Sequence, residues 1–141
     1  MIPTSSSTST GLRSGTLILL DTHVVGWLYE GADRRIPSAV RELIEADAPF
    51  VSPVVELELT YLYEIGRVTE PASAPLAALR KRIGLQVADA SLASVTQAAA
   101  GLSWTRDPFD RLISAQAIVA DAQLVTADRT ILEHLALATW D

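Results

Sequence analysis

Residues 17–21 read Leu-Ile-Leu-Leu-Asp, and residues 124–128 read Leu-Val-Thr-Ala-Asp. Each stretch is a short apolar run that ends at an aspartate. A continuous apolar run is typical of a strand buried in a parallel sheet. Ligands of open α/β sheets collect at the carboxyl ends of the strands. We therefore expect Asp21 and Asp128 to lie at the same edge of one sheet.

The rest of the chain alternates predicted strands with predicted helices. Strands are expected over 17–20, 50–52, 85–87, 122–126 and 137–140, and helices over 22–30, 53–65, 74–83, 91–100, 108–120 and 130–135, with one more that begins at Pro37. Strands and helices that alternate in this way favour parallel pairing with right-handed crossovers. The predicted fold is a single α/β domain with a central, mostly parallel five-stranded sheet flanked by helices.

Composition limits the classes of protein to consider. The chain has 141 residues, of which 49% are hydrophobic, and it contains no cysteine. One domain with a sizeable core is expected, and disulfides and cysteine-ligated metal centres are excluded. No stretch approaches the ~18 apolar residues of a membrane span. Residues 1–15 are rich in Ser and Thr and lack the apolar core of a signal peptide, so we predict a disordered tail, a domain over 16–141 and a cytoplasmic location.

Glu58 has an unusual position on its predicted helix. When the helix over 53–65 is drawn with the helical period, Val54, Leu62 and Leu59 share an apolar face, and Glu58 falls in the middle of it. A glutamate that faces a core is costly unless it is paired or binds a metal. An ion pair with a buried arginine is the alternative. Glu56 faces outward and is expected to be ordinary surface.

Asp107 and Asp110 bracket the start of the helix over 108–120. Asp107 is a good N-cap, and Asp110 lies in the first turn, where the helix dipole favours an anion. Ser114 and Ala117 follow on the same face as Asp110, and such small residues would leave room for an ion and a ligand. Asp110 is therefore a candidate ligand, and Asp107 is first a cap or supporting residue.

Asp21 and Asp128 have the same two interpretations. Either aspartate could simply cap the helix that follows it. Thr126 could hold a carboxylate or a metal-bound water through its hydroxyl, or be a satisfied strand hydroxyl. Three acids at strand-to-helix junctions, with a fourth on an apolar helical face, make a metal site the stronger interpretation. Bound cations would also offset the net charge of −6, which otherwise argues against nucleic-acid binding.

Other kinds of site have little support. His23 and His134 lack the spacing of a helical zinc pair, and no glycine-rich phosphate loop follows a predicted strand. Trp27, Trp104 and Trp140 are expected to belong to the core rather than to act as stacking platforms.

Four stretches of this sequence resemble a PIN-domain ribonuclease, specifically a VapC-type toxin of a bacterial toxin–antitoxin pair. They are Leu-Leu-Asp-Thr-His (19–23), Val-Ser-Pro-Val-Val-Glu-Leu-Glu-Leu (51–59), Arg-Asp-Pro-Phe-Asp-Arg-Leu-Ile-Ser-Ala-Gln-Ala (106–117) and Leu-Val-Thr-Ala-Asp-Arg (124–129). The resemblance extends from about Leu17 to Asp141. It places the four acids of the family, catalytic and metal-binding, on Asp21, Glu58, Asp110 and Asp128.

The resemblance also implies an activity and partners. An oxygen-only ligand set selects Mg²⁺ or Mn²⁺, and the implied reaction is metal-dependent hydrolysis of RNA. The implied partners are an RNA substrate, a cognate VapB-type antitoxin and a second copy of the chain in a homodimer. Arg106, Arg111 and Arg129 stand beside aspartates and are candidates for contacts with the RNA backbone.

Two further classes of protein remain as alternatives. One is a non-catalytic PIN-like or receiver-like module that binds Mg²⁺ and a partner, although the only lysine, Lys81, is not at a strand end. The other is a haloacid dehalogenase phosphatase, which needs an acid two residues after the first aspartate. His23 occupies that position.

Overall fold

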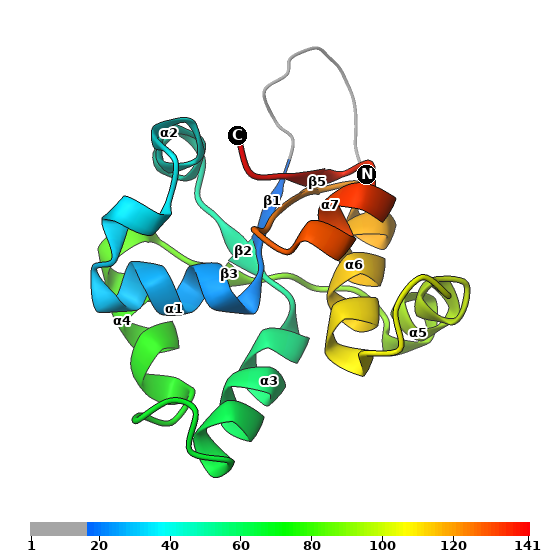
Figure 1. Ribbon diagram of the computed structural model, residues 1–141, viewed down its shortest axis with the longest axis horizontal. Helices are drawn as coiled ribbons and strands as arrows, with labels where there is room; N and C mark the ends of the chain where they lie inside the picture. The colour runs from blue at the N-terminus through cyan, green and yellow to red at the C-terminus, as the bar shows by residue number, and fades with distance from the viewer. Residues whose placement is uncertain (1–16) are drawn as a thin grey trace.

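The computed structural model describes residues 17–141, which form a five-stranded sheet in the order β3-β2-β1-β4-β5. Every neighbouring pair of strands is parallel. The predicted α/β class and the five strands are thereby confirmed. Helices surround the sheet in Figure 1, with α1 and α4 on one side of the view and α5 and α6 on the other. The predicted tail, residues 1–15, lies outside the described residues.

The elements follow the order expected from the sequence. The strands are β1 (Ile18–Leu20), β2 (Phe50–Val51), β3 (Gln86–Val87), β4 (Gln123–Val125) and β5 (Ala138–Thr139). The helices are α1 (Thr22–Glu30), α2 (Ser38–Ala46), α3 (Pro53–Glu64), α4 (Ser73–Ile83), α5 (Leu92–Ala100), α6 (Pro108–Ala120) and α7 (Arg129–His134), with a short 3₁₀ turn η1 (Asp33–Arg35) that the pattern did not predict.

The core explains why β1 and β4 form the centre of the sheet. Their apolar residues are almost fully buried, and they pack with apolar residues of α1, α3 and α6 in one cluster. Strands buried on both faces need continuous apolar runs. An aspartate follows each run at the carboxyl edge of the sheet.

Helix ends largely agree with their sequence signals. Gly31 and Gly84 adopt the left-handed conformation after α1 and α4, as expected for glycine at a helix C-terminus. Asp121 ends α6 in the same conformation with a φ of 51°, and nothing in the sequence predicted it. The predicted strand over 122–126 is one residue shorter at each end, although the Thr126 N–H still donates a bond of 3.1 Å to the Thr139 carbonyl of β5.

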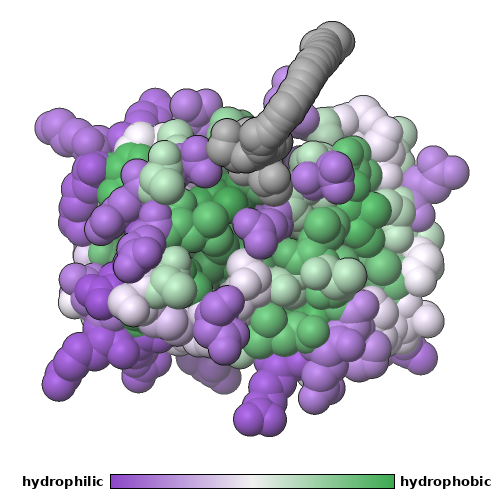
Figure 2. Space-filling view, turned by 90° about the horizontal axis from the view of Figure 1, so that it is seen from above, coloured by the Kyte–Doolittle hydropathy of each residue, from purple (hydrophilic) through white to green (hydrophobic). Residues whose placement is uncertain are grey.

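The strands begin and end at opposite edges of the molecule. In Figure 1, β1 begins near the top and runs down into α1, so the strand carboxyl ends lie in the lower half. Figure 2 views the opposite edge from above, where apolar side chains form two areas separated by hydrophilic ones. None of the helices between residues 17 and 141 has the length and hydropathy needed to cross a membrane.

Candidate active site

Asp21 is the most enclosed acid of the predicted site. It follows β1 directly and is only 5% exposed. Its Oδ1 accepts a hydrogen bond of 2.8 Å from the Thr22 backbone N–H, and its Oδ2 accepts one of 2.6 Å from the Thr126 hydroxyl. Burial raises the pKa of Asp21, and these two hydrogen bonds oppose that rise. The carboxylate is therefore held in one orientation at the centre of the sheet edge.

Thr126 connects the ends of the two central strands. Its side chain is fully buried, and its Oγ1 also accepts a hydrogen bond of 3.0 Å from the Asp128 backbone N–H. Asp128 in turn caps α7, because its Oδ1 accepts a bond of 3.0 Å from the Ile131 N–H. The predicted capping role of Asp128 and the predicted carboxylate-holding role of Thr126 are both present.

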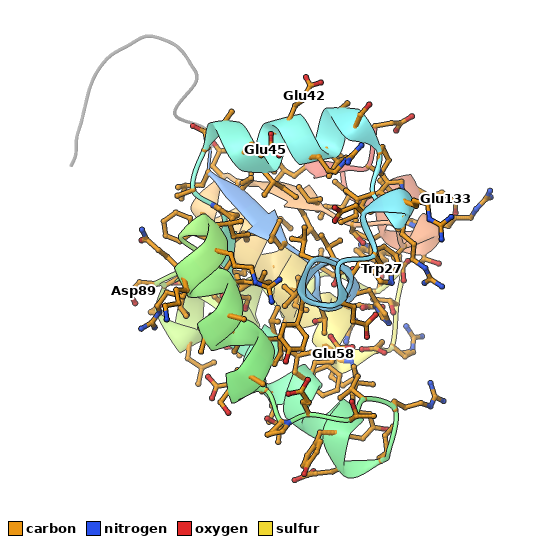
Figure 3. The ribbon with its side chains drawn as sticks, turned by 90° about the vertical axis from the view of Figure 1, so that its left-hand side faces the viewer. Trp27, Glu42, Glu45, Glu58, Asp89 and Glu133 are labelled. Carbon is orange, nitrogen blue, oxygen red and sulfur yellow. The ribbon has the colours of Figure 1, made fainter. Side chains whose placement is uncertain are left out.

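Glu58 points from α3 toward the start of α1. Its Oε1 accepts a hydrogen bond of 2.6 Å from the Thr22 hydroxyl, and its side chain is half-buried. Burial raises the pKa of Glu58, Asp21 raises it further, and the bond from Thr22 lowers it. The expected placement toward the interior is correct, and no arginine is among the groups that shift this pKa. In Figure 3, which looks along α1, Glu58 is labelled between α1 and α3.

The apolar face of α3 is narrower than the sequence pattern predicted. Val55 and Leu59 are buried, but Ile65 lies beyond the end of the helix and is 48% exposed. Leu57 and Tyr61, which flank that face, are also exposed. Glu56 faces solvent as expected.

Asp107 and Asp110 open α6 on the other side of the site. Asp107 is exposed, and its Oδ1 accepts bonds from the backbone N–H groups of Phe109 at 2.8 Å and Asp110 at 3.1 Å. This is the predicted N-cap. It fixes the first turn of the helix, which carries the Asp110 carboxyl toward the other acids.

Asp110 lies close enough to the other acids for their charges to act on its carboxyl. Desolvation and then the charges of four neighbouring acids raise the pKa of Asp110 from 3.8 to about 7; these acids are Asp107, Asp21, Asp128 and Glu58. Nearby negative charges repel a further one, so they disfavour ionisation of the Asp110 carboxyl. The structure thus brings together all four acids that the sequence predicted.

The four acids lie near one another, but their carboxylates do not surround a common point. Within residues 17–141, no three His, Asp or Glu side chains are close enough to hold a metal ion as they stand. The predicted four-carboxylate site is therefore not preformed. A hard divalent cation nevertheless fits this group of residues, because all four offer oxygen donors and because their mutual repulsion favours a compensating positive charge.

Two polar pairs that the sequence analysis missed hold the helices that carry the acids. The Ser52 hydroxyl donates a bond of 3.0 Å to Gln116 Oε1, and both side chains are buried. This pair ties the start of α3 to the middle of α6. The second is Thr22 with Glu58. Ser52 could have been found as the N-cap before Pro53, whereas its partner, 64 residues away, could not.

The space predicted beside Asp110 for an ion and a ligand is not open to solvent. Ser114 and Ala117 are fully buried, and Ala117 packs in the main core. These small residues let α6 approach the sheet closely, so the prediction that they leave space for a ligand is wrong. The Ser114 hydroxyl is buried without a hydrogen-bond partner.

Two of the three candidate arginines are already engaged with the backbone. Arg106 Nη1 donates to the Ser103 carbonyl at 2.9 Å, and Arg111 Nε donates to the Leu102 carbonyl at 2.8 Å. Both bonds brace the loop before α6. Arg129 is exposed at the start of α7. Contacts of these side chains with RNA remain a prediction.

Comparisons with known proteins identify the family to which this fold belongs. The family model for the PIN domain matches residues 18–136. Ribonuclease VapC22 of Mycobacterium tuberculosis is 34% identical over 122 residues, which cover 84% of this chain and 92% of the relative.

Solved structures support the same fold at lower sequence identity. VapBC2 from Rickettsia felis, bound to a DNA fragment from its promoter, matches with a TM-score of 0.65 and 20% identity over 89% of this chain and 99% of the other. DNA-bound VapBC from Salmonella typhimurium matches with a TM-score of 0.57 and 21% identity over 87% and 95%. The chain therefore belongs to the PIN domain family and is of the VapC type.

Proposed function

We propose that this chain is a metal-dependent endoribonuclease that acts as the toxin of a toxin–antitoxin pair. One observation carries the proposal: carboxylates from four separate elements lie near one sheet edge, where burial, and then the charges of the neighbouring acids, raise the pKa of Asp110 to about 7. The name of the M. tuberculosis relative supports the reaction class, and the two VapBC complexes support a cognate VapB-type antitoxin. With RNA as its substrate, the protein would act in the cytoplasm.

The proposed cofactor is Mg²⁺ or Mn²⁺, because oxygen donors select hard cations. Asp21, Glu58, Asp110 and Asp128 would hold it. When bound, such an ion supplies a water of lowered pKa and offsets charge on the phosphate. Asp110 must lose its proton before it can act as a ligand, so we expect metal affinity to increase as the pH rises through about 7.

The remaining residues orient these carboxylates. Thr126 holds one oxygen of Asp21, and Thr22 holds one oxygen of Glu58. Asp107 fixes the turn that presents Asp110. Hydrogen bonds of this kind commonly tune metal ligands and their affinity. Arg129 is the best placed of the three arginines to contact the RNA backbone, because it is exposed beside Asp128 while Arg106 and Arg111 donate to backbone carbonyls.

Substitution of Asp110 tests the proposal directly. Asp110→Asn should abolish Mg²⁺- or Mn²⁺-dependent cleavage of RNA and growth arrest on induction, and Asp21→Asn should do the same. Asp121→Asn is a matched control at the other end of α6, because Asp121 is exposed and its left-handed conformation suits asparagine. Full cleavage by the two folded active-site variants would overturn the proposed mechanism.

Metal binding separates an enzyme from a binding module. Calorimetric titration of the full chain with Mn²⁺ should show binding that Asp110→Asn weakens. Binding without RNA cleavage would instead support a non-catalytic module. Co-purification with a VapB-type protein and the mass of the free chain in solution would test the proposed antitoxin and homodimer.

A further inference from the structure

A cavity beside two of the acids continues the candidate site along α1. Its volume is about 220 Å³, and it is lined by Asp21, His23, Trp27, Ala127 and Asp128. Two acids form one side, and two aromatic rings contribute much of the rest. The function proposed above assigns a role to the two acids and none to the aromatic side of the cavity, which consists of His23 and Trp27.

The aromatic side follows from the spacing on α1. His23 and Trp27 are four residues apart, so their side chains share one face of the helix. Their ring centroids lie 6.4 Å apart. Figure 3 looks along α1 and shows Trp27 and Glu58 on different sides of that helix, with Trp27 toward α7. The cavity therefore begins at the carboxylates and extends along the Trp27 side of α1.

Trp27 is held in place by residues outside the cavity. Its ring lies 5.7 Å from that of Trp140, with a tilt of 55° between them. The Arg35 guanidinium carbon lies 5.4 Å from the Trp27 ring centroid. Trp27 also packs against the main core while remaining partly exposed. A ring that is already oriented loses little conformational freedom when a ligand binds to it.

The lining restricts what this cavity can hold. Asp21 and Asp128 disfavour an anion, and the aromatic rings favour a flat, uncharged group. A base of single-stranded nucleic acid has that shape, and aromatic side chains commonly stack on such bases. Arg35 lies over the Trp27 ring, so a base would stack on the opposite face of the indole. From there the cationic guanidinium can contact a neighbouring backbone phosphate. With the proposed divalent cation at the acids, the order acids, aromatic ring, arginine would match scissile phosphate, base and neighbouring phosphate.

We propose that this cavity binds one unpaired nucleobase of the RNA substrate, stacked on Trp27 next to the phosphate to be cleaved. The inference rests on the proposed ribonuclease function and adds a base-binding subsite to it. Trp27 touches the substrate base here, and Trp140 positions Trp27. The sequence analysis assigned both tryptophans to the core, and both pack at its edge.

Binding can be measured apart from cleavage in the Asp110→Asn background of the full chain. The probes are fluorescently labelled RNA hexamers of uridine, cytidine or adenosine, followed by anisotropy. Trp27→Leu should weaken binding roughly 5- to 100-fold, the range for loss of one stacked base, while Trp27→Phe should retain most of the affinity. Trp104→Leu is the matched control, because Trp104 is also partly exposed but stacks on His134 away from the cavity.

A second measurement needs no substitution at Trp27. In the NMR spectrum of the Asp110→Asn protein, the indole N–H signal of Trp27 should shift on addition of the hexamers, and that of Trp104 should stay in place. The proposal is overturned if the Trp27 signal does not move at saturation, if no hexamer binds, or if folded Trp27→Leu binds as tightly as its parent. Each of these results is independent of whether Asp110→Asn abolishes cleavage, so the two proposals can fail separately.

Discussion

The junction at Asp21 and the junction at Asp128 share one local sequence pattern but differ in their surroundings. In both, an aspartate in extended conformation follows a buried parallel strand, and a helix begins at the next residue; Asp21 comes directly after β1, and Asp128 comes three residues after the end of β4. Asp128 caps α7 through the Ile131 N–H, and it is partly exposed. Asp21 is buried, and the Thr126 hydroxyl from the neighbouring strand end holds its second oxygen.

The difference arises from the place of each strand in the sheet. β1 is the central strand, with β2 and β4 on either side, whereas β4 adjoins the edge strand β5. The end of β1 is therefore enclosed by both neighbours and by the helices that cover them. The same local pattern thus gives a mainly capping aspartate at one junction and a desolvated, hydrogen-bonded carboxylate at the other.

Loss of the Thr126 hydroxyl should have the largest effect, because this group links the two junctions. Thr126→Val removes the donor to Asp21 and the acceptor for the Asp128 N–H. We expect RNA cleavage to fall roughly 10- to 100-fold and the free energy of unfolding to fall by about 1–3 kcal/mol. Steady-state cleavage assays and urea denaturation measure the two effects.

Thr126→Ser is the control for that substitution, because serine keeps the hydroxyl and loses only a methyl group. It should retain most of the activity. Equal activity of the valine and serine variants would show that the bridge between the junctions does not orient Asp21.

The next largest expected effect is the change in the free energy of unfolding with pH. Folding raises the pKa of Asp110 to about 7, so between about pH 4 and 7 the folded state binds more protons than the unfolded state. The free energy of unfolding therefore falls as the pH rises through this window. For a half-buried carboxyl we expect a loss of about 1–2 kcal/mol, which Asp110→Asn should remove. Thermal denaturation with a chelator present measures both proteins, and an unchanged slope in the variant would contradict the assignment.

The same titration can compare the two junctions. Both Asp21 and Asp128 raise the pKa of Asp110, and Asp21 has the larger effect. Asp21→Asn should therefore lower the pKa of the Asp110 carboxyl more than Asp128→Asn does. Carbon NMR of the Asp110 carboxyl would reveal the order, and a reversed order would place Asp128 nearer to Asp110 than the structure does.

Removal of the α7 cap should have the smallest effect. Asp128→Ala should lower the free energy of unfolding by about 1 kcal/mol, because the Ile131 N–H loses its acceptor. Asp128→Asn should change it little, since asparagine caps as well as aspartate. Chemical denaturation distinguishes the two variants. If both are equally stable, the cap contributes nothing to folding.

Much of the fold could be predicted because its signals are local. Apolar runs mark β1 and β4, Pro53 and Pro108 mark helix starts, and glycines mark several helix ends. The bounds of short edge strands such as β5 were harder to predict, because two residues give only a weak hydrophobic pattern. The left-handed Asp121 had no sequence signal, since aspartate adopts that conformation only where the surrounding structure requires it.

The sequence by itself determined which residues are the candidate acids of the site and which elements carry them. Local rules sufficed, because strand ends and helix starts orient the carboxylates, and the helical period turned Glu58 inward. Only the tertiary structure decided how those acids differ. Burial of Asp21, the Thr126 bridge, the bond from Thr22 to Glu58 and the pKa of Asp110 all depend on contacts between residues far apart in the chain. Long-range packing sets desolvation and charge spacing, and no local pattern encodes either.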